Sequence, residues 1–350
     1  MSDIQRKLAT IRRIVEIRPI EGADNIEVAT VDGWDVVVKK GEFEVGDLAV
    51  YFEIDSLLPM EPEFEFLRMS CYRKTAQQEG FKLRTIKLRG QVSQGLLIPL
   101  EIGKTIFYRR DGMYLTMAWA EGLDVTNMLG VEKWIENIPV ELAGDVEGRF
   151  PSFIPRTDEE RIQNLTSKWS QWKDQHHFYA TEKLDGTSFT CFLKEGEFGV
   201  CSRNWQIKET EGNLQWKIAR ELDLEQKLRG LNRNIAIQGE LIGHGIQKNI
   251  YNLSKHTINV FSVYDIDAQK YLPYLQLIEV VANLELSIAP LLFWNKGLSD
   301  FSVQDLVQYA DDKSVLNPKA DREGIVVRAM EDSSISFKVI SNKFLAKQKD

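Results

Sequence analysis

Charged residues interrupt the most apolar runs in the second half of this chain. The run 178–182 leads into Lys183-Leu184-Asp185-Gly186, Glu240 lies within the run 235–242, and Glu323 precedes a further apolar run. A carboxylate in a buried strand costs free energy unless it is paired with a cation or binds a metal. The pattern therefore predicts strands whose acidic positions have a functional role.

Further short polar clusters follow in a fixed order along the same half. Ser202-Arg203-Asn204 comes after one strand-like run, residues 261–265 lie in another, and Ser336-Phe337-Lys338 comes near the end. The pattern from Lys183 to Gly186 is weak alone, because a salt-bridged surface turn closed by glycine has the same sequence. Several such matches in one order favour a functional site over that turn.

Together these segments resemble the motifs of the covalent nucleotidyltransferases, which include polynucleotide ligases and messenger-RNA capping enzymes. In that family's order, Lys183 to Gly186 would be motif I, Ser202 to Asn204 motif Ia, and Gly239-Glu240 motif III. Residues 261–265 would be motif IIIa, Glu323-Gly324 motif IV and Lys338 motif V. The resemblance covers about residues 150–350. It implies that Lys183 bonds covalently to a nucleotide.

The net charge of the chain limits how it can contact nucleic acid. With 350 residues and a charge of −8, the chain lacks the overall basic character that phosphate contacts favour. Any such contact must use a local basic stripe, for which Arg84, Lys87 and Arg89 are candidates, although a solvated face explains them equally well. The acidity agrees with an enzyme that gathers carboxylates around a divalent metal.

Cysteine usage and hydropathy indicate the compartment. Cys71, Cys191 and Cys201 form neither a paired framework nor a metal-ligand spacing, so we expect reduced thiols. No apolar run is long enough to span a bilayer, and the first residues do not form a secretory signal. We therefore expect a cytoplasmic protein without a membrane partner.

The two halves of the chain differ in character, and the fold class expected is α+β. Short β-branched and aromatic runs bounded by glycine and aspartate predict an OB-like β-barrel over residues 1–105, which would bind nucleic acid. Residues 106–149 are expected to be a connector. Residues 150–350 mix helices with strands, and the resemblance implies a ligase-type nucleotidyltransferase (adenylyltransferase) domain built on antiparallel sheets. The predicted strands of the barrel are 8–17, 26–31, 35–39, 48–54, 82–88 and 95–99; the predicted helices of the second half are 213–229, 272–284 and one that begins after Thr157 or Asp158.

Lys183 can act as a nucleophile only if its pKa is lowered. A free lysine amine has a pKa of about 10.4 and is almost entirely cationic at neutral pH. Burial or a nearby positive charge lowers that value. A divalent cation, Mg²⁺ or Mn²⁺, held mostly through water by Asp185, Glu240 and Glu323 would do so, and would offset charge as the α-phosphate of ATP reacts.

The resemblance implies a set of residues around ATP. Arg203 and Asn204 would hold ribose and phosphate, and Phe261 would stack on adenine, with Tyr264 as the alternative and two core aromatics as the structural explanation. Lys338 and Lys343 would bind the α-phosphate. Related RNA ligases often carry a second lysine two residues after the first in motif V, and Ile340 stands there, which leaves the role of Lys343 open. The remaining members of the set are Glu182, Gly186 and, for the β- and γ-phosphates, Arg161 ahead of Arg156.

Domain order narrows the resemblance to RNA ligases, most closely the RNA ligase 5 family. The candidate barrel precedes the catalytic half, whereas DNA ligases and capping enzymes carry an OB domain after it, and little chain follows Lys338. That family implies sealing of 3′-hydroxyl and 5′-phosphate ends of RNA, or of a duplex containing RNA, especially at nicks. We expect the protein to be a monomer. DNA nick sealing, guanylyl transfer, or RNA binding by a non-catalytic protein remain the alternatives.

Overall fold

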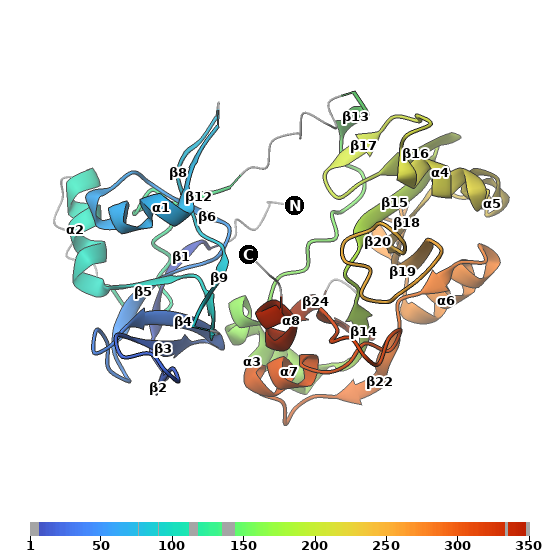
Figure 1. Cartoon of the computed structure of the whole chain (residues 1–350). Helices are drawn as coiled ribbons and strands as arrows, with labels where there is room; N and C mark the ends of the chain where they lie inside the picture. Colours follow the sequence, from blue (N-terminus) through green and yellow to red (C-terminus); the bar gives the residue numbers. More distant parts are fainter. Residues whose placement is uncertain are drawn as a thin grey trace. The chain divides into compact units, whose positions relative to one another are not determined.

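The computed structural model describes residues 7–75, 77–89, 91–111, 118–134, 144–332 and 335–347 (Figure 1). The chain forms two compact units. Unit 1 comprises Met1–Asn137 with Ala346–Asp350, and unit 2 comprises Ile138–Leu345.

Unit 1 is built from short antiparallel strands, as the alternation of apolar and polar residues predicts. Strand β5 (Leu48–Phe52) is buried at its centre and pairs with β1 (Ala9–Arg13) on one side and β11 (Leu96–Pro99) on the other. The remaining elements are the sheet β2 (Glu16–Pro19), β3 (Ile26–Val31) and β4 (Trp34–Lys39); the pair β9 (Thr85–Leu88) and β10 (Gln91–Gln94); the sheet β12 (Glu132–Lys133), β6 (Ser56–Leu58), β8 (Glu79–Lys82) and β7 (Tyr72–Lys74); the 3₁₀ helix η1 (Pro62–Leu67); and helices α1 (Arg68–Cys71) and α2 (Leu100–Asp111).

The predicted strand 8–17 is wrong as one element, because it divides into β1 and β2. At Ile14 the backbone amide donates to Asp47 O at 2.9 Å, and at Val15 it donates to Thr30 O at 2.9 Å. The chain thus changes its partner strand between two adjacent residues, which alternation of side chains cannot reveal.

Residues beyond the predicted barrel boundary also pack into unit 1. Val125, Leu129 and Val131 are buried in the same apolar cluster as Ile11 and Phe52. Part of the segment that the sequence assigns to a connector is therefore core of the N-terminal unit.

Unit 2 contains two sheets, which are antiparallel except where the short β21 pairs with β19 in parallel. The larger has β18 (Ile235–Ile242) near its centre, between β15 (Thr187–Lys194) and β19 (Thr257–Asp265). The smaller has β14 (His177–Lys183) and β23 (Gly324–Ala329) at its centre. The outer strands of the larger sheet are β13 (Val146–Arg149), β17 (Trp205–Ile207), β16 (Glu197–Cys201), β20 (Lys270–Tyr271) and β21 (Ser287–Ile288), and those of the smaller are β22 (Leu291–Gly297) and β24 (Ser336–Ile340).

Helices cover one face of each sheet (Figure 1). Helices α4 (Leu214–Glu221), α5 (Leu224–Gly230) and α6 (Tyr274–Asn283) contribute to the core of the larger sheet, where the predicted helices 213–229 and 272–284 lie. Helices α3 (Thr166–Gln175) and α7 (Val303–Ala310) pack against the smaller sheet. The 3₁₀ helix η3 (Ile162–Asn164) also belongs to this unit, and α8 (Asn342–Lys347) begins in it. None of the helices within the described ranges is long and apolar enough to cross a membrane.

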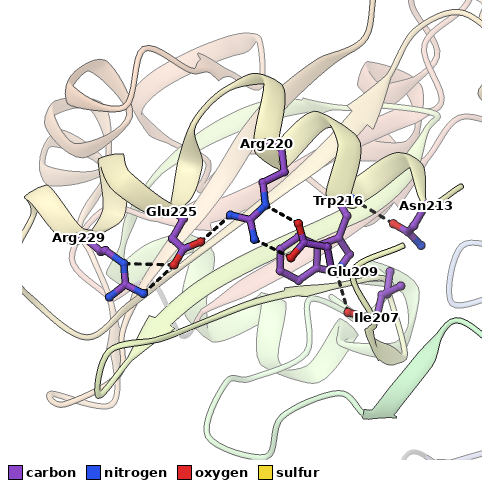
Figure 2. Close-up of polar contacts among 7 residues, drawn as sticks. All are labelled: Ile207, Glu209, Asn213, Trp216, Arg220, Glu225 and Arg229. Atoms are coloured by element: carbon purple, nitrogen blue, oxygen red, sulfur yellow. Dashed lines mark hydrogen bonds and ion pairs between the residues drawn. The ribbon is translucent and has the colours of Figure 1, made fainter. Parts of the chain in front are cut away.

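A polar network fixes the position of β17 (Figure 2). The Trp216 indole N–H donates to Ile207 O at 2.7 Å, and Asn213 caps α4 by accepting from Trp216 N at 3.0 Å. Arg220 lies over the Trp216 ring and pairs with Glu209 at 2.6 Å. The network therefore anchors the strand that follows Arg203 and Asn204.

Candidate active site

Strand pairing brings Lys183 to Glu323. Lys183 ends β14 and lies opposite Gly324, the first residue of β23, so Glu323 stands directly beside the lysine. The Lys183 Nζ donates to Glu323 Oε1 at 2.6 Å, and the two side chains are only 28% and 18% exposed. The sequence separates these residues widely, and the sheet makes them an ion pair.

Two further carboxylates act on the same pair. Burial, together with the negative charges of Glu323 and Asp185, raises the pKa of Glu240 to about 7 against the opposing attraction of Lys183. Burial and Glu323 also raise the pKa of Asp185. The structure thus gathers all three predicted carboxylates around Lys183.

The negative charge of these carboxylates determines the protonation state of Lys183. Burial lowers the pKa of the amine, but Glu323 and Glu240 outweigh that effect, and the pKa of Lys183 is raised. The isolated protein therefore holds Lys183 as an ammonium ion, which has no lone pair for attack. A further positive charge among the carboxylates is needed to reverse the balance.

Motif I adopts its conformation because β18 passes close to Gly186. A Cβ at Gly186 would lie 2.5 Å from Leu241 O and 2.9 Å from Glu240 Cγ, so only glycine fits there. The backbone amide of Asp185 is held by Tyr251, whose hydroxyl oxygen accepts from it at 2.6 Å. Sequence reasoning missed Tyr251, since it lies in a long loop after β18.

Lys338 and Arg203 meet at Asp158. The Asp158 carboxylate accepts from Lys338 Nζ at 3.0 Å and from Arg203 Nη2 at 3.1 Å. Burial lowers the pKa of Lys338, and the positive charges of Lys183 and Arg161 lower it further, while Asp158 opposes them. Two cations that the resemblance assigns to the nucleotide therefore share one acidic partner.

The predicted helix beginning at Thr157 or Asp158 is wrong. Residues 155–160 contain no helix, and the chain instead runs beside β24, where Lys338 N donates to Glu160 O at 2.9 Å and Arg161 forms a parallel bridge with Lys338. The acidic side chains that suggested the first turn of a helix are used for ion pairs instead.

A cavity of about 230 Å³ has Asp158 and Phe261 in its lining. The Arg328 guanidinium lies 5.8 Å from the Phe261 ring centroid and pairs with Glu159. Arg156 lines the same cavity and is exposed. Tyr264 instead packs in an apolar cluster, 5.1 Å from the Tyr271 ring, so Phe261 rather than Tyr264 faces the cavity.

Three residues predicted to lie around ATP form hydrogen bonds with the protein backbone. Asn204 offers its carbonyl to Phe150 N at 3.0 Å. Glu182 is buried and accepts from Val315 N at 2.7 Å, and strand alternation turns it to the face of β14 opposite Lys183. Lys343 donates from Nζ to Asp311 O at 3.1 Å, which ties it to the end of α7.

Buried polar atoms remain for a ligand. Thr181 Oγ1 and Asn259 Nδ2 are buried without a hydrogen-bond partner among the residues that the structure describes. Thr181 lies on the same face of β14 as Lys183, and Asn259 is directly opposite Glu240 in the pairing of β18 with β19. An acceptor and a donor therefore point into the region where the two sheets bring the charged residues together. Neither residue had a signal in the sequence beyond lying in a strand.

The described side chains do not form a site that coordinates a metal ion directly. Within the described ranges, no group of three or more His, Cys, Asp or Glu side chains could hold a metal ion by itself. The three carboxylates can support a cation through intervening water, which is how Mg²⁺ is often held.

Comparisons with known proteins place this geometry in a family. A model of an OB-fold domain matches residues 8–100, and a model of RNA ligase matches residues 176–341. No curated protein matches the chain at a significant level.

Solved structures of the Naegleria gruberi RNA ligase match almost the whole chain. A lysine-to-methionine variant with AMP and Mn is 40% identical, covers 99% of this chain and 100% of its own, and superposes with a TM-score of 0.81. The enzyme with pyrophosphate is 40% identical, covers 99% of each chain, and has a TM-score of 0.80. A glutamate-to-alanine variant with ATP and Mn is also 40% identical, with 99% and 100% coverage and a TM-score of 0.80.

The chain belongs to the RNA ligase family. The predicted resemblance is confirmed, as is the predicted order of an N-terminal OB fold followed by a mixed α/β ligase domain with antiparallel sheets.

Proposed function

We propose that this protein is an ATP-dependent RNA ligase that works through a lysyl-AMP intermediate on Lys183. The observation that carries the proposal is the pairing of the partly buried Lys183 amine with Glu323 at 2.6 Å, beside Glu240 and Asp185. A structural ion pair would not require two additional carboxylates whose pKa values are raised by burial and by Glu323.

ATP suits the residues around this cluster. Lys338 and Arg203 supply positive charge for phosphate, and the Phe261 ring offers a flat apolar surface for a base. Thr181 Oγ1 can accept from an exocyclic amine and Asn259 Nδ2 can donate to a ring nitrogen, which would satisfy both buried atoms. Arg161, Arg156 and Lys343 complete the proposed phosphate-binding set, and Glu182, Gly186 and Asn204 the structural frame around the nucleotide.

A divalent cation, Mg²⁺ or Mn²⁺, is the proposed partner of the three carboxylates. It would neutralise the field that raises the Lys183 pKa and would offset charge on the α-phosphate. With that field removed, burial of Lys183 favours the neutral amine. The protein's own contribution is to hold the amine, the acids and the phosphate-binding cations in one geometry.

Three displacements at phosphorus make up the proposed reaction. The Lys183 amine bonds to the α-phosphorus of ATP and pyrophosphate leaves. A 5′-phosphate oxygen of RNA then attacks the same phosphorus, and the lysine amine is the leaving group. Finally a 3′-hydroxyl attacks the 5′-phosphorus, and AMP leaves as the phosphodiester forms. Because each step develops negative charge on phosphate oxygens, one electrostatic setting can serve all three.

Relatives support the assignment of residues. Variants of the Naegleria enzyme with solved structures replace, in chain order, a lysine, an aspartate, two glutamates and a further lysine. This chain carries the same residue types in the same order, and the intervals between the first three are the same in both chains. The matching residues here are Lys183, Asp185, Glu240, Glu323 and Lys338.

The substrate proposed is a nick in a duplex that contains RNA, with 3′-hydroxyl and 5′-phosphate ends, so that the biological role would be RNA repair. We propose that unit 1 positions this duplex, where Arg84 and Arg89 are exposed near the β9–β10 hairpin. We further propose that the protein is a monomer. We also propose that it acts in a reducing cytoplasm, because Cys71, Cys191 and Cys201 are buried free thiols.

The test is mass spectrometry of the protein after incubation with ATP and Mn²⁺. One added AMP on Lys183, lost in Lys183→Ala together with sealing of a nicked RNA duplex, is the expected result. Labelling by GTP alone would indicate guanylyl transfer instead. Sealing that persists in Lys183→Ala would show that another residue is the nucleophile.

A further inference from the structure

We infer that the loop of residues 243–256 is a binding surface for the phosphate backbone of the RNA strand that is joined, an inference that rests on the proposed function. This basic loop follows β18 and leads into β19. It contains two lysines and two histidines and no aspartate or glutamate, in a chain whose net charge is −8. A concentration of positive charge in an acidic protein is what a polyanion requires.

The basic loop is attached directly to motif I. Tyr251 is buried and accepts from Asp185 N at 2.6 Å, while Gln247 Nε2 donates to Gly186 O at 3.1 Å. The ring of Tyr251 packs with Leu184 and Ile242 in a small apolar cluster. The loop is therefore placed beside the predicted nucleophile by two hydrogen bonds and a packed core.

The loop is also rigid at both ends. Gly243 has φ +141°, and a Cβ there would lie 2.5 Å from Lys255 O, so the two ends of the loop pass in close contact. His256 Nε2 lies 2.8 Å from His244 O, and Asn249 exchanges two hydrogen bonds with the backbone of Leu253. Its charged side chains therefore project from a preorganised frame, which reduces the entropy that binding costs.

The cations of this frame are available to a ligand. Lys248, Lys255 and His244 are exposed, and their side chains form no ion pair or hydrogen bond with any described residue. Lys248 is near enough to Asp185 for its positive charge to offset part of the rise in the pKa of that carboxyl. The positive charge of the loop thus extends from Lys248, near Asp185, to Lys255, near the end of the loop.

This arrangement favours a nucleic-acid strand over the phosphates of ATP. The cations assigned to the nucleotide, Lys338 and Arg203, both contact the Asp158 carboxylate. The positive charges of Lys183 and Arg161 also lie near enough to Lys338 to lower its pKa. The basic loop acts instead on Asp185, and its charges are spread along a loop rather than converging on one point. Phosphates that repeat along a strand match a spread of cations, whereas a single triphosphate matches a convergent set.

The test compares equilibrium binding of a nicked, 5′-phosphorylated RNA duplex by the full chain and by a Lys248→Ala/Lys255→Ala variant over a range of salt concentrations. One neutralised phosphate contributes about 0.7–0.9 to the slope of log Kd against log salt, or about a five- to eightfold change in Kd at about 0.1 M salt. The double variant should therefore bind about 25- to 60-fold more weakly, with a slope reduced by about 1.4–1.8. Lys248→Arg/Lys255→Arg should restore both.

Lys217→Ala is the matched control, because Lys217 is an exposed lysine of the same unit on α4, 3.9 Å from Glu221. It should bind the duplex as the wild type does. A double variant with unchanged Kd and slope would overturn the inference. So would a fall in self-adenylylation as large as the fall in duplex binding, because that result assigns the loop to ATP. Failure of the wild type to form lysyl-AMP would instead refute the proposed function, and the duplex-binding measurement would still decide the role of the loop.

Discussion

Replacing Gly186 with alanine tests whether close contact between motif I and β18 creates the catalytic geometry. The added Cβ would lie 2.5 Å from Leu241 O, 2.6 Å from Ile242 Cγ2 and 2.9 Å from Glu240 Cγ. Ordinary contacts of carbon with other heavy atoms lie at about 3.5–4.0 Å, so the two segments must separate by about 1 Å. Because Glu240 itself is one of the displaced groups, the change moves a carboxylate away from Lys183.

The magnitude follows from that displacement. A misplacement of about 1 Å at reacting groups costs about 10²-fold in rate. Overpacking of this kind also lowers the free energy of unfolding by about 1–3 kcal/mol. For a unit of this size we expect the melting temperature to fall by about 2–12 °C. The protein should therefore fold but form lysyl-AMP slowly.

The assay is single-turnover formation of lysyl-AMP from labelled ATP with Mn²⁺, run beside a thermal melt. Gly212→Ala is the control, because a Cβ there meets no atom within 4 Å. It should match the wild type in both measurements. If Gly186→Ala is folded and reacts within about threefold of the wild-type rate, where about 10²-fold is expected, the close contact does not position the site and the reasoning is refuted.

Three further predictions concern neighbouring groups. Tyr251→Phe removes the acceptor of the Asp185 amide and should lower the free energy of unfolding by about 1–3 kcal/mol, measured by urea denaturation; an unchanged midpoint would contradict the role of that hydrogen bond. The pKa of Glu240 is raised to about 7, so the folded protein holds a proton there that the unfolded chain releases near its ordinary pKa of about 4.3. Metal-free protein should therefore lose stability as pH rises from about 4.3 to 7, and thermal melts in EDTA should show a weaker loss in Glu240→Gln; equal slopes would refute the assignment. Asp158→Asn frees the two cations that it pairs with and should lower the KM for ATP in self-adenylylation about 1.5- to 5-fold, since an exposed ion pair contributes about 0.2–1 kcal/mol. A higher KM would show that Asp158 helps to bind the nucleotide.

The sequence predicted two helical regions of unit 2 and the charged residues of its buried strands, because both depend on local pattern. The helices 213–229 and 272–284 appear as α4 with α5 and as α6. Lys183, Glu240 and Glu323 could be singled out because a charge in a buried strand has no cheap structural explanation. These inferences need only the period of the side chains and the cost of burying charge.

Predictions failed where the partner of a residue lies far along the chain. By its sequence, Asp158 is a candidate to cap the N-terminus of a helix, yet its carboxylate pairs with Lys338 and Arg203. Ile14 reads as the middle of a strand, yet the chain changes its pairing there. In both cases a long-range contact outweighs a local preference that is small by comparison.

By itself, the sequence determined which residues carry charge into the strands and in which order they occur. Only the tertiary structure decided their environment, and with it the pKa of Glu240, the protonation of Lys183 and the attachment of the basic loop to motif I. The physical reason is that a pKa depends on burial and on charges a few ångströms away. Those charges lie on β14, on β18 and just before β23, segments far apart in the sequence that the fold brings together.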